Sequence, residues 1–140
     1  HRLFPGLLKT TPAFKQLCGL HAGKPFTLYA QQKTAVLKNF LFEFPQVENP
    51  VVTIIIPVYN HAAYTFNCLL SLHNHISHHN TEIIVVNDRS TDETAELLEQ
   101  INGITVLNNS SNLGYLRSCN KGATAAKGKF LLLLNNDIQA

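Results

Sequence analysis

The feature that most constrains this 140-residue chain is a nearly unbroken apolar run, VVTIIIPV, at residues 51–58. A strand with one wet face alternates apolar and polar side chains, whereas this run is mostly β-branched and apolar throughout. It therefore predicts a strand that is buried on both faces, as in a parallel sheet covered by helices. Shorter apolar runs at 83–86, 104–107 and 129–134 predict three more strands.

The segments between these runs carry helical patterns. Apolar side chains recur at helical spacing from Ala62 to His73. Ser90 and Glu93 match a capping box that would start a second helix, and Gly103 suits the position just past its end. A third helix is expected over about 114–127, stopped by Gly128, with these inward positions: Leu116, Ala123 and Ala126. Alternating strands and helices predict a doubly wound, mostly parallel α/β sheet over residues 51–140.

Residues 1–50 differ from the rest in charge. They hold six Lys or Arg and two Asp or Glu, whereas residues 51–140 hold five and seven. We expect 1–50 to be an N-terminal extension or linker, largely helical, with one helix starting at Thr11-Pro12 and another within 27–41. The positive charge allows association with a membrane surface. The lack of a clean amphipathic stripe favours a linker helix instead.

Composition excludes several other classes of protein. Hydrophobic residues make up 45% and charged residues 14%, which is typical of a folded protein, and a net charge of +2 gives no reason to expect nucleic-acid binding. No apolar run approaches the roughly 20 residues of a membrane span, and no signal peptide is visible. Cys18, Cys68 and Cys119 are odd in number and far apart, which indicates reduced thiols and a cytoplasmic location.

Polar residues gather directly after the predicted strands. These positions are 59–60, 87–89, 108–112 and 135–137. The carboxyl ends of parallel strands share one edge of a sheet, where ligands of such folds bind. Asp88 and Asp137 each suit an ordinary turn. We expect the two to lie at the ends of neighbouring strands, where they are also suited to bind a nucleoside and to hold a divalent cation against a diphosphate.

Other sites are less well supported. The turn after residue 58 has no G-x-G-x-x-G, and no P-loop is present. His75 and His79 have the spacing of a zinc pair on a helix, but no Cys or acidic ligand accompanies them, which favours a solvated helix end. Arg117 and Lys121 suit either a phosphate contact or a solvated basic face.

Three segments in order, TIIIPVYN, EIIVVNDRSTDET and NLGYLRSCNKGATAAKGKFLLLLNND, resemble the family-2 glycosyltransferases of GT-A fold. The resemblance covers about residues 51–140. It implies a nucleotide-diphosphate sugar as donor and Mn²⁺ or Mg²⁺ as cofactor. The residues that the resemblance assigns to the nucleotide are Pro57, Val58, Tyr59, Asn60, Asp88, Asn112, Gly114, Asn120 and Asn136.

Within this set the resemblance implies distinct roles. Asp88 would bind the base, Asn136 would lie near the ribose or phosphate, and Asp137 would contact the metal. Asn87 stands where many members have a second Asp. The motif reads Asn135-Asn136-Asp137, so its first position is neutral where the family's DXD pattern has an acid. An NND form is found in members that act on rhamnose, galactofuranose and related sugars.

The resemblance also implies the reaction. An acceptor hydroxyl, deprotonated by an acidic base, displaces the nucleoside diphosphate with inversion. We expect that base and the acceptor site beyond Ala140, so that this chain is the donor-binding half, truncated after the fourth strand and inactive alone in transfer. The acceptor would be a glycan or lipid-linked glycan at the inner face of the membrane. The alternative is a non-catalytic nucleotide-binding or protein-interaction module.

Overall fold

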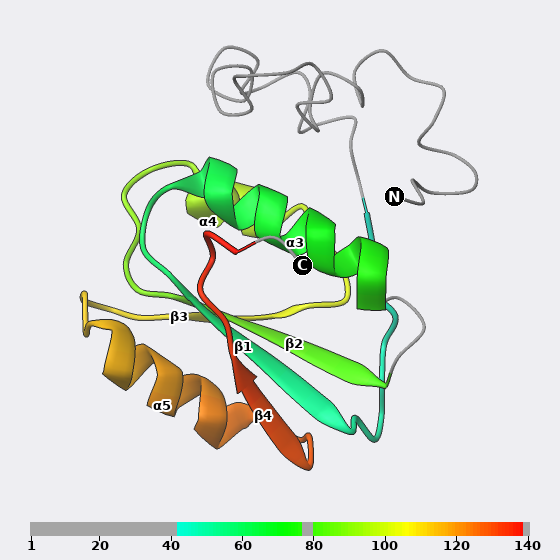
Figure 1. Ribbon diagram of the computed structural model, residues 1–140. Coiled ribbons are helices and arrows are strands. Elements are labelled where there is room, and N and C mark those ends of the chain that lie inside the picture. Colours follow the sequence, from blue (N-terminus) through cyan, green and yellow to red (C-terminus); the bar gives the residue numbers. More distant parts are fainter. Residues whose placement is uncertain (1–41, 77–79, 139–140) are drawn as a thin grey trace, which may run out of the picture. The chain divides into compact units, whose positions relative to one another are not determined.

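The computed structural model describes residues 42–76 and 80–138, which form a four-stranded parallel sheet (Figure 1). The strands are β1 (Val52–Val58), β2 (Thr81–Asn87), β3 (Thr105–Asn108) and β4 (Phe130–Leu133), in the spatial order β3-β2-β1-β4. The four predicted strands are therefore confirmed.

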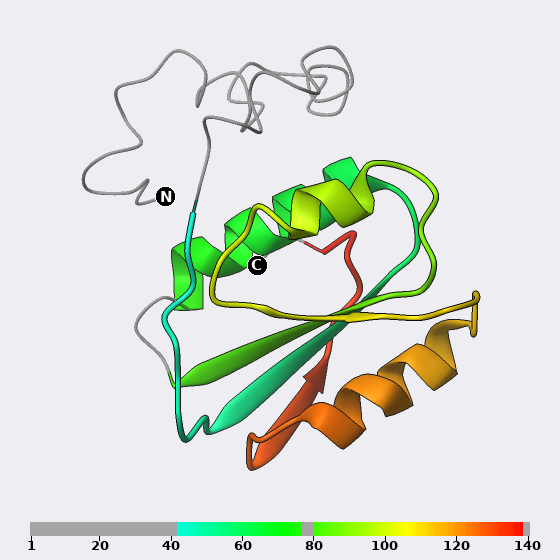
Figure 2. The same ribbon diagram turned by 180° about the vertical axis from the view of Figure 1, so that it is seen from behind.

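Three helices connect the strands and cover both faces of the sheet. They are α3 (Ala62–Ile76), α4 (Thr94–Leu98) and α5 (Tyr115–Ala125). The views from front and back both show α3 and α4 on one face and α5 on the other (Figures 1 and 2). This is the doubly wound arrangement that the alternating pattern predicted.

The central strand explains why the run at 51–58 is apolar. β1 pairs with β2 on one side and with β4 on the other, and helices lie over both of its faces. Its residues Ile54, Ile55 and Ile56 are each at most 4% exposed. A side chain pointing either way from β1 therefore meets protein, which is why no polar alternation is present.

Aromatic side chains of the segment before β1 pack on this domain. Phe42 and Phe44 are buried, and both rings contact His73 of α3 with centroid distances of 5.2 and 5.5 Å. Gly103 has φ of +79°, and a Cβ there would lie 1.9 Å from the Phe44 carbonyl oxygen. Its role is this close approach, not the end of a helix. The helices expected at Thr11 and within 27–41 lie outside the described residues.

Two details of the predicted helices were wrong. The second helix begins at Thr94, with Glu93 instead of Ser90 as its N-cap and no side-chain capping bond from that residue. Asp92 accepts from the Thr94 backbone N–H at 3.0 Å instead. In the third helix Leu116 is 71% exposed, because the first turn of α5 lies beyond the ends of the strands (Figure 1). Ala123 and Ala126 do pack inward, against Ile55 and its neighbours.

Within the described residues the sheet has β3 at one edge and β4 at the other, and β4 is the more exposed of the two. Its four side chains, Phe130 to Leu133, are between 46% and 66% exposed. Exposed apolar edge strands are typical sites of further pairing. None of the helices in the described ranges is long and apolar enough to cross a membrane.

Candidate functional site

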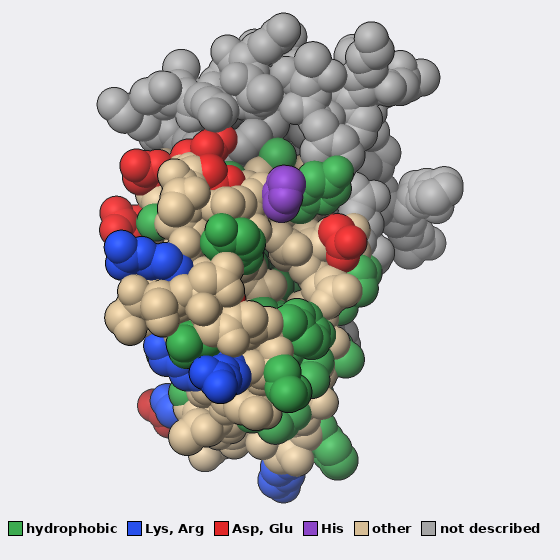
Figure 3. Space-filling view, turned by 90° about the vertical axis from the view of Figure 1, so that its left-hand side faces the viewer, with side chains coloured by type: hydrophobic (Ala, Val, Ile, Leu, Met, Phe, Trp, Pro, Cys, Tyr) green, Lys and Arg blue, Asp and Glu red, His purple; other side chains and the backbone are tan. Residues whose placement is uncertain are grey.

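The carboxyl edge of the sheet brings together most of the polar residues that the sequence singled out. The strand order reverses between β1 and β4, and ligands of doubly wound sheets bind at such a reversal. Asn60 follows β1 there, and Asn135 to Asp137 follow β4. Asp88 follows β2, so β1 separates the two acids and their strands are not neighbours, contrary to expectation. Figure 3 shows this edge, with basic, acidic and histidine side chains on its surface.

Asp88 is buried and its carboxylate is engaged by the protein. Oδ1 accepts from Asn109 Nδ2 and from the Leu113 backbone N–H, both at 2.7 Å, and Oδ2 accepts from the Gly114 N–H at 2.8 Å. The side chain is 4% exposed. Asp88 therefore fixes the loop between β3 and α5, and any base that it binds has to use the remaining lone pair of a carboxylate oxygen.

These contacts keep Asp88 ionised. Burial alone raises the pKa of the carboxyl, but hydrogen bonds from Leu113, Asn109, Gly114 and Ser118 outweigh it and leave the pKa below its ordinary value. Asp92 behaves in the same way. Burial raises its pKa, but hydrogen bonds from Thr94, Ala62 and His61 have the larger effect and leave the pKa below its ordinary value. Both groups therefore favour the folded state when they are charged.

The two lowered pKa values predict how stability depends on pH. A carboxyl whose pKa is lower in the folded chain stabilises it above the unfolded pKa of about 3.9. That contribution is lost as the pH falls below about 4 and approaches the lower pKa values that these carboxyls have in the folded chain. Urea midpoints should therefore fall as the pH drops below about 4. The gap in midpoint between wild type and Asp92→Asn should shrink over that fall. A gap to Asp92→Asn that is unchanged down to pH 2 would contradict the assignment.

A second network ties the loop after β1 to the loop after β2. Asn60 Oδ1 accepts from the Thr91 N–H at 2.7 Å, and the Asn60 N–H donates to Ser90 Oγ at 2.8 Å. Asp92 Oδ2 accepts from the Ala62 N–H at the start of α3, at 3.2 Å. Since α3 has no acid in its own first turn, Asp92 supplies that negative charge from the other loop.

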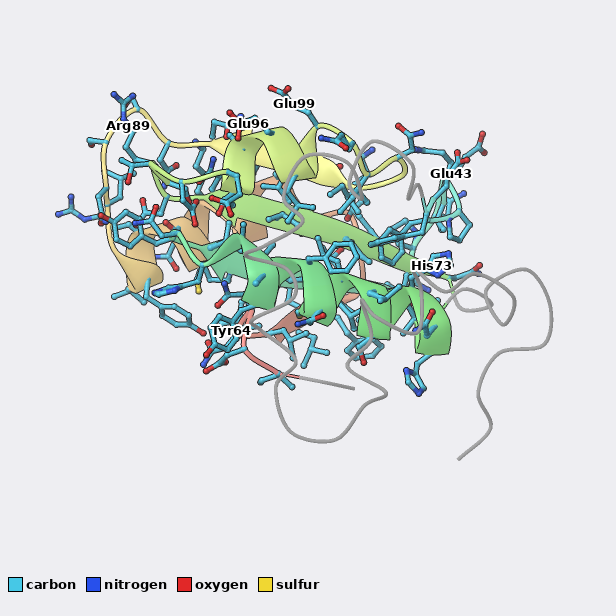
Figure 4. All side chains as sticks on the ribbon, turned by 90° about the horizontal axis from the view of Figure 1, so that it is seen from above. Glu43, Tyr64, His73, Arg89, Glu96 and Glu99 are labelled. Atoms are coloured by element: carbon cyan, nitrogen blue, oxygen red, sulfur yellow. The ribbon has the colours of Figure 1, made fainter. Side chains whose placement is uncertain are left out.

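This network holds backbone conformations that side chains disfavour. Asn60, His61 and Arg89 have φ of +57°, +60° and +64°. Such residues cost free energy and persist where the surroundings hold them, often at functional sites. Arg89 lies at the tip of its loop and points away from the domain, at the same end as Tyr64 of α3 (Figure 4).

The Asn135-Asn136-Asp137 motif forms a turn after β4. Asn135 and Asp137 are exposed, and Asn136 is half-buried. Asn136 Nδ2 donates to Thr65 Oγ1 at 3.0 Å, and the Cys68 thiol lies 3.8 Å from the Asn135 carbonyl oxygen. Within the described part of the chain no hydrogen bond or ion pair engages the Asp137 carboxylate. It is free to bind a ligand, unlike that of Asp88.

Cys68 lies close enough to Asp137 to feel its charge. Burial and, to a smaller extent, the Asp137 carboxylate raise the pKa of the Cys68 thiol to about 11. The thiol is therefore protonated at neutral pH and can donate to the Asn135 carbonyl. Cys68 and Cys119 are both free thiols and both buried.

The remaining predicted residues divide into accessible and buried ones. Tyr59 is 49% exposed, and Asn112 and Asn120 are also exposed. Pro57 and Val58 are buried, and the Val58 carbonyl accepts from the Asp88 N–H at 2.8 Å. Gly114, with φ of +80°, precedes the first residue of α5, and its N–H donates to Asp88.

The two basic residues of α5 have different environments. Lys121 Nζ donates to the Asn108 carbonyl at 2.8 Å and to Asn109 Oδ1 at 2.7 Å, which engages two of its three N–H donors. Arg117 is exposed. The sequence did not reveal these contacts of Lys121. It also did not reveal the hydrogen bonds made at the site by Asn109, Ser118, Thr65 and Asp92. Asn109 was detectable as a polar residue after a strand, whereas Thr65 looks like any buried helix position.

A multidentate metal centre made by protein alone is absent from the described ranges, where no group of three or more His, Cys, Asp or Glu comes together. His75 Nδ1 lies 2.8 Å from the Ser71 carbonyl, and His79 lies outside these ranges, so the zinc pair is not seen. Mg²⁺ in nucleotide sites commonly uses one or two carboxylates and completes its shell with phosphates and water. Asp137, with the Asn135 amide oxygen nearby in sequence, fits that donor set.

The parallel sheet with helices on both faces and polar loops at its carboxyl edge defines a GT-A-type α/β domain. The chain belongs to glycosyl transferase family 2, whose model matches residues 53–140. The family resemblance found in the sequence is thereby confirmed, and with it membership of a family of sugar-transferring enzymes.

Individual relatives agree with this family. The chain is 36% identical over 96 residues to the putative glycosyltransferase EpsH of Bacillus subtilis, covering 65% of this chain and 27% of EpsH. The structure of S. aureus TarS 1–349 in complex with UDP-GlcNAc matches with 28% identity and a TM-score of 0.55, over 61% of this chain and 26% of TarS. The mannosyltransferase PcManGT from Pyrobaculum calidifontis shares the fold, with 21% identity and a TM-score of 0.58. The match covers 88% of this chain and 38% of PcManGT.

Proposed function

We propose that this chain binds the donor for transfer of a sugar, with inversion, from a nucleotide-diphosphate sugar to an acceptor. The observation that carries the proposal is the exposed, unpartnered Asp137 carboxylate at the reversal between β1 and β4. The chain spans about a quarter of the length of EpsH and TarS. The acceptor and the catalytic base therefore belong to the proposal for the whole protein.

Around that carboxylate we assign the nucleotide to the loops after β1, β2 and β3. Tyr59 and Asn60 would line one side of the bound nucleotide. Asp88 and the loop from Asn112 to Gly114 would line the side of the base, and Asn120 would contact the nucleotide from α5. Exposed Asn and Tyr side chains provide donors and acceptors for a base and ribose. The bound UDP-GlcNAc of TarS makes uridine nucleotides the first probes to try.

A divalent cation, Mn²⁺ or Mg²⁺, would be held by Asp137 and by the donor's diphosphate. When bound, such an ion stabilises the negative charge that the leaving diphosphate acquires. The contribution of this chain is to place one carboxylate at the strand reversal and to leave it unpaired. A glycan or lipid-linked glycan acceptor, at the cytoplasmic face of a membrane, belongs to the same proposal. The excess of basic residues in 1–50 supports that placement.

Calorimetry tests the proposal directly. UDP, GDP and their sugar derivatives should be titrated into the protein with Mn²⁺, with Mg²⁺ and with EDTA. At least one nucleoside diphosphate should bind, and it should bind about tenfold or more tightly with metal than with EDTA, because a cation held by Asp137 would offset the negative charge of the diphosphate. If the folded protein binds none of these nucleotides under any of the three conditions, the proposal is wrong.

A further inference from the structure

The Asn135-Asn136-Asp137 turn is attached to the rest of the domain by few contacts. The last backbone bond between β4 and β1 joins the Leu134 N–H to the Ile55 carbonyl at 3.0 Å, one residue before the turn. Within the turn the Ile138 N–H lies 3.4 Å from the Asn135 carbonyl. The sheet hydrogen bonds therefore end before the Asn135-Asn136-Asp137 turn, and the position of Asp137 has to be set by contacts from outside the sheet.

Two side chains of α3 supply that attachment. Thr65 and Cys68 are three residues apart on the helix, so they project from the same face. Thr65 Oγ1 accepts from Asn136 Nδ2 at 3.0 Å, and Cys68 Sγ contacts the Asn135 carbonyl at 3.8 Å. In the described part of the chain these are the two side-chain hydrogen bonds that reach the motif, and both come from one helical turn.

The burial of these two side chains makes the contacts specific. Thr65 is 0% exposed and Cys68 is 1% exposed, so neither can exchange its motif contact for one to bulk water. Asn136 is half-buried beside them, while its neighbours Asn135 and Asp137 face solvent. The turn is thus held on its inner side and open on its outer side, which is the arrangement that keeps a single ligand oxygen pointing outward.

We propose that Thr65 and Cys68 are positioning residues that fix the orientation of Asp137, with Thr65 the stronger of the two. They act through Asn136 and Asn135 and touch neither metal nor nucleotide. This inference rests on the proposed role of Asp137 in binding a divalent cation. Groups one step removed from a metal commonly alter its affinity when they are changed.

The central experiment compares Thr65→Val with Thr65→Ser. Valine keeps the shape of threonine and removes the hydroxyl, whereas serine keeps the hydroxyl and removes the methyl group. The quantity measured is the Mn²⁺ concentration that half-saturates UDP binding, or GDP binding if only that nucleotide binds. Thr65→Val should raise it about 3- to 10-fold, as expected for one lost hydrogen bond, and Thr65→Ser should remain near wild type. Affinity for the nucleotide in EDTA should not change.

A matched control separates positioning from general damage. Thr53 is also 0% exposed, and its hydroxyl donates to Glu82 Oε2 at 2.6 Å near the amino end of β1, at the opposite edge of the sheet. Thr53→Val should lower thermal stability without changing the Mn²⁺ requirement. Cys68→Ala, which removes the weaker contact, should raise that requirement by about twofold. It also provides a second test if Thr65→Val does not fold.

The outcomes distinguish this inference from the proposed function. If wild type shows a metal effect that Asp137→Ala removes, but Thr65→Val and Cys68→Ala both keep the wild-type Mn²⁺ requirement, the positioning role is wrong and the metal site stands. If Thr53→Val raises the Mn²⁺ requirement as much as Thr65→Val, the effect is general and the inference is likewise overturned. If Asp137→Ala changes nothing, the proposed metal site itself fails.

Discussion

Replacing Asp137 with alanine should abolish the effect of Mn²⁺ or Mg²⁺ on the binding of nucleoside diphosphates. Asp137 carries the only charge in the Asn135-Asn136-Asp137 turn, and no group of three or more His, Cys, Asp or Glu among the described residues offers a separate metal centre. Loss of an outer partner of a metal ligand already costs about 10–100-fold in affinity, so loss of the ligand itself should cost at least as much. Titration of UDP and GDP in Mn²⁺ and in EDTA measures the effect.

The same substitution should leave the fold intact. Asp137 is exposed and its carboxylate has no hydrogen-bond partner in the described part of the chain, so removing it should change the free energy of unfolding by less than about 0.5 kcal/mol. Glu96→Ala is the matched control, because Glu96 is an exposed acid on α4, away from the motif (Figure 4). If Asp137→Ala binds nucleotide with the wild-type dependence on metal, Asp137 is not the ligand.

The strands could be predicted because their signal is local. A strand that is buried on both faces has to be apolar at every position, and VVTIIIPV shows this without knowledge of its neighbours. The strand order could not be read in the same way. Whether β4 pairs beside β1 or beside β3 depends on contacts between residues far apart in the sequence, such as Val52 with Phe130. This is why β1 was not expected to lie between Asp88 and Asp137.

The capping box shows how a local rule can match and still fail. Ser90 and Glu93 have the right spacing, but Ser90 Oγ accepts from the Asn60 N–H in the loop after β1. Asp92 reaches both the Ala62 and the Thr94 N–H groups, and thus serves the start of two helices at once. The two oxygens of one carboxylate can accept from N–H groups at the starts of both helices.

The sequence predicted where the candidate site lies, but it did not predict the burial and hydrogen bonds of the residues in it. Asp88 and Asp137 both follow strands, and nothing in their local sequence tells that one is buried and engaged while the other is exposed and unpaired. That difference arises because the Asn109–Gly114 loop folds over Asp88, whereas nothing described folds over Asp137. Thr65 and Cys68 escaped notice because helical spacing marks both only as core positions.

Replacing Asp88 with asparagine should destabilise the domain more than any change at the other strand ends. An asparagine keeps one acceptor oxygen but turns an NH₂ group towards a backbone N–H, either that of Gly114 or that of Leu113. Gly114 retains a bond to Asn112 Oδ1 at 3.1 Å, and Asn109 retains Ser118 Oγ at 3.0 Å, which limits the damage. We expect a loss of about 2–4 kcal/mol, since hydrogen bonds to charged groups are worth about 1.5–3 kcal/mol each.

Three measurements follow from this loss. The melting temperature should fall by roughly 10–20 °C for a domain of this size. The amide protons of Leu113 and Gly114 should exchange faster with solvent, because both lose the charged acceptor that holds the loop. Nucleotide affinity in EDTA should fall about tenfold, because the loop from Asn112 to Gly114 would no longer be held in place and any bond from Asp88 to the base would be lost. Asp137→Asn is the control, since it makes the same chemical change at an exposed residue and should leave all three unchanged. If Asp88→Asn retains wild-type stability and wild-type amide exchange at Leu113 and Gly114, Asp88 does not hold the loop as these contacts indicate.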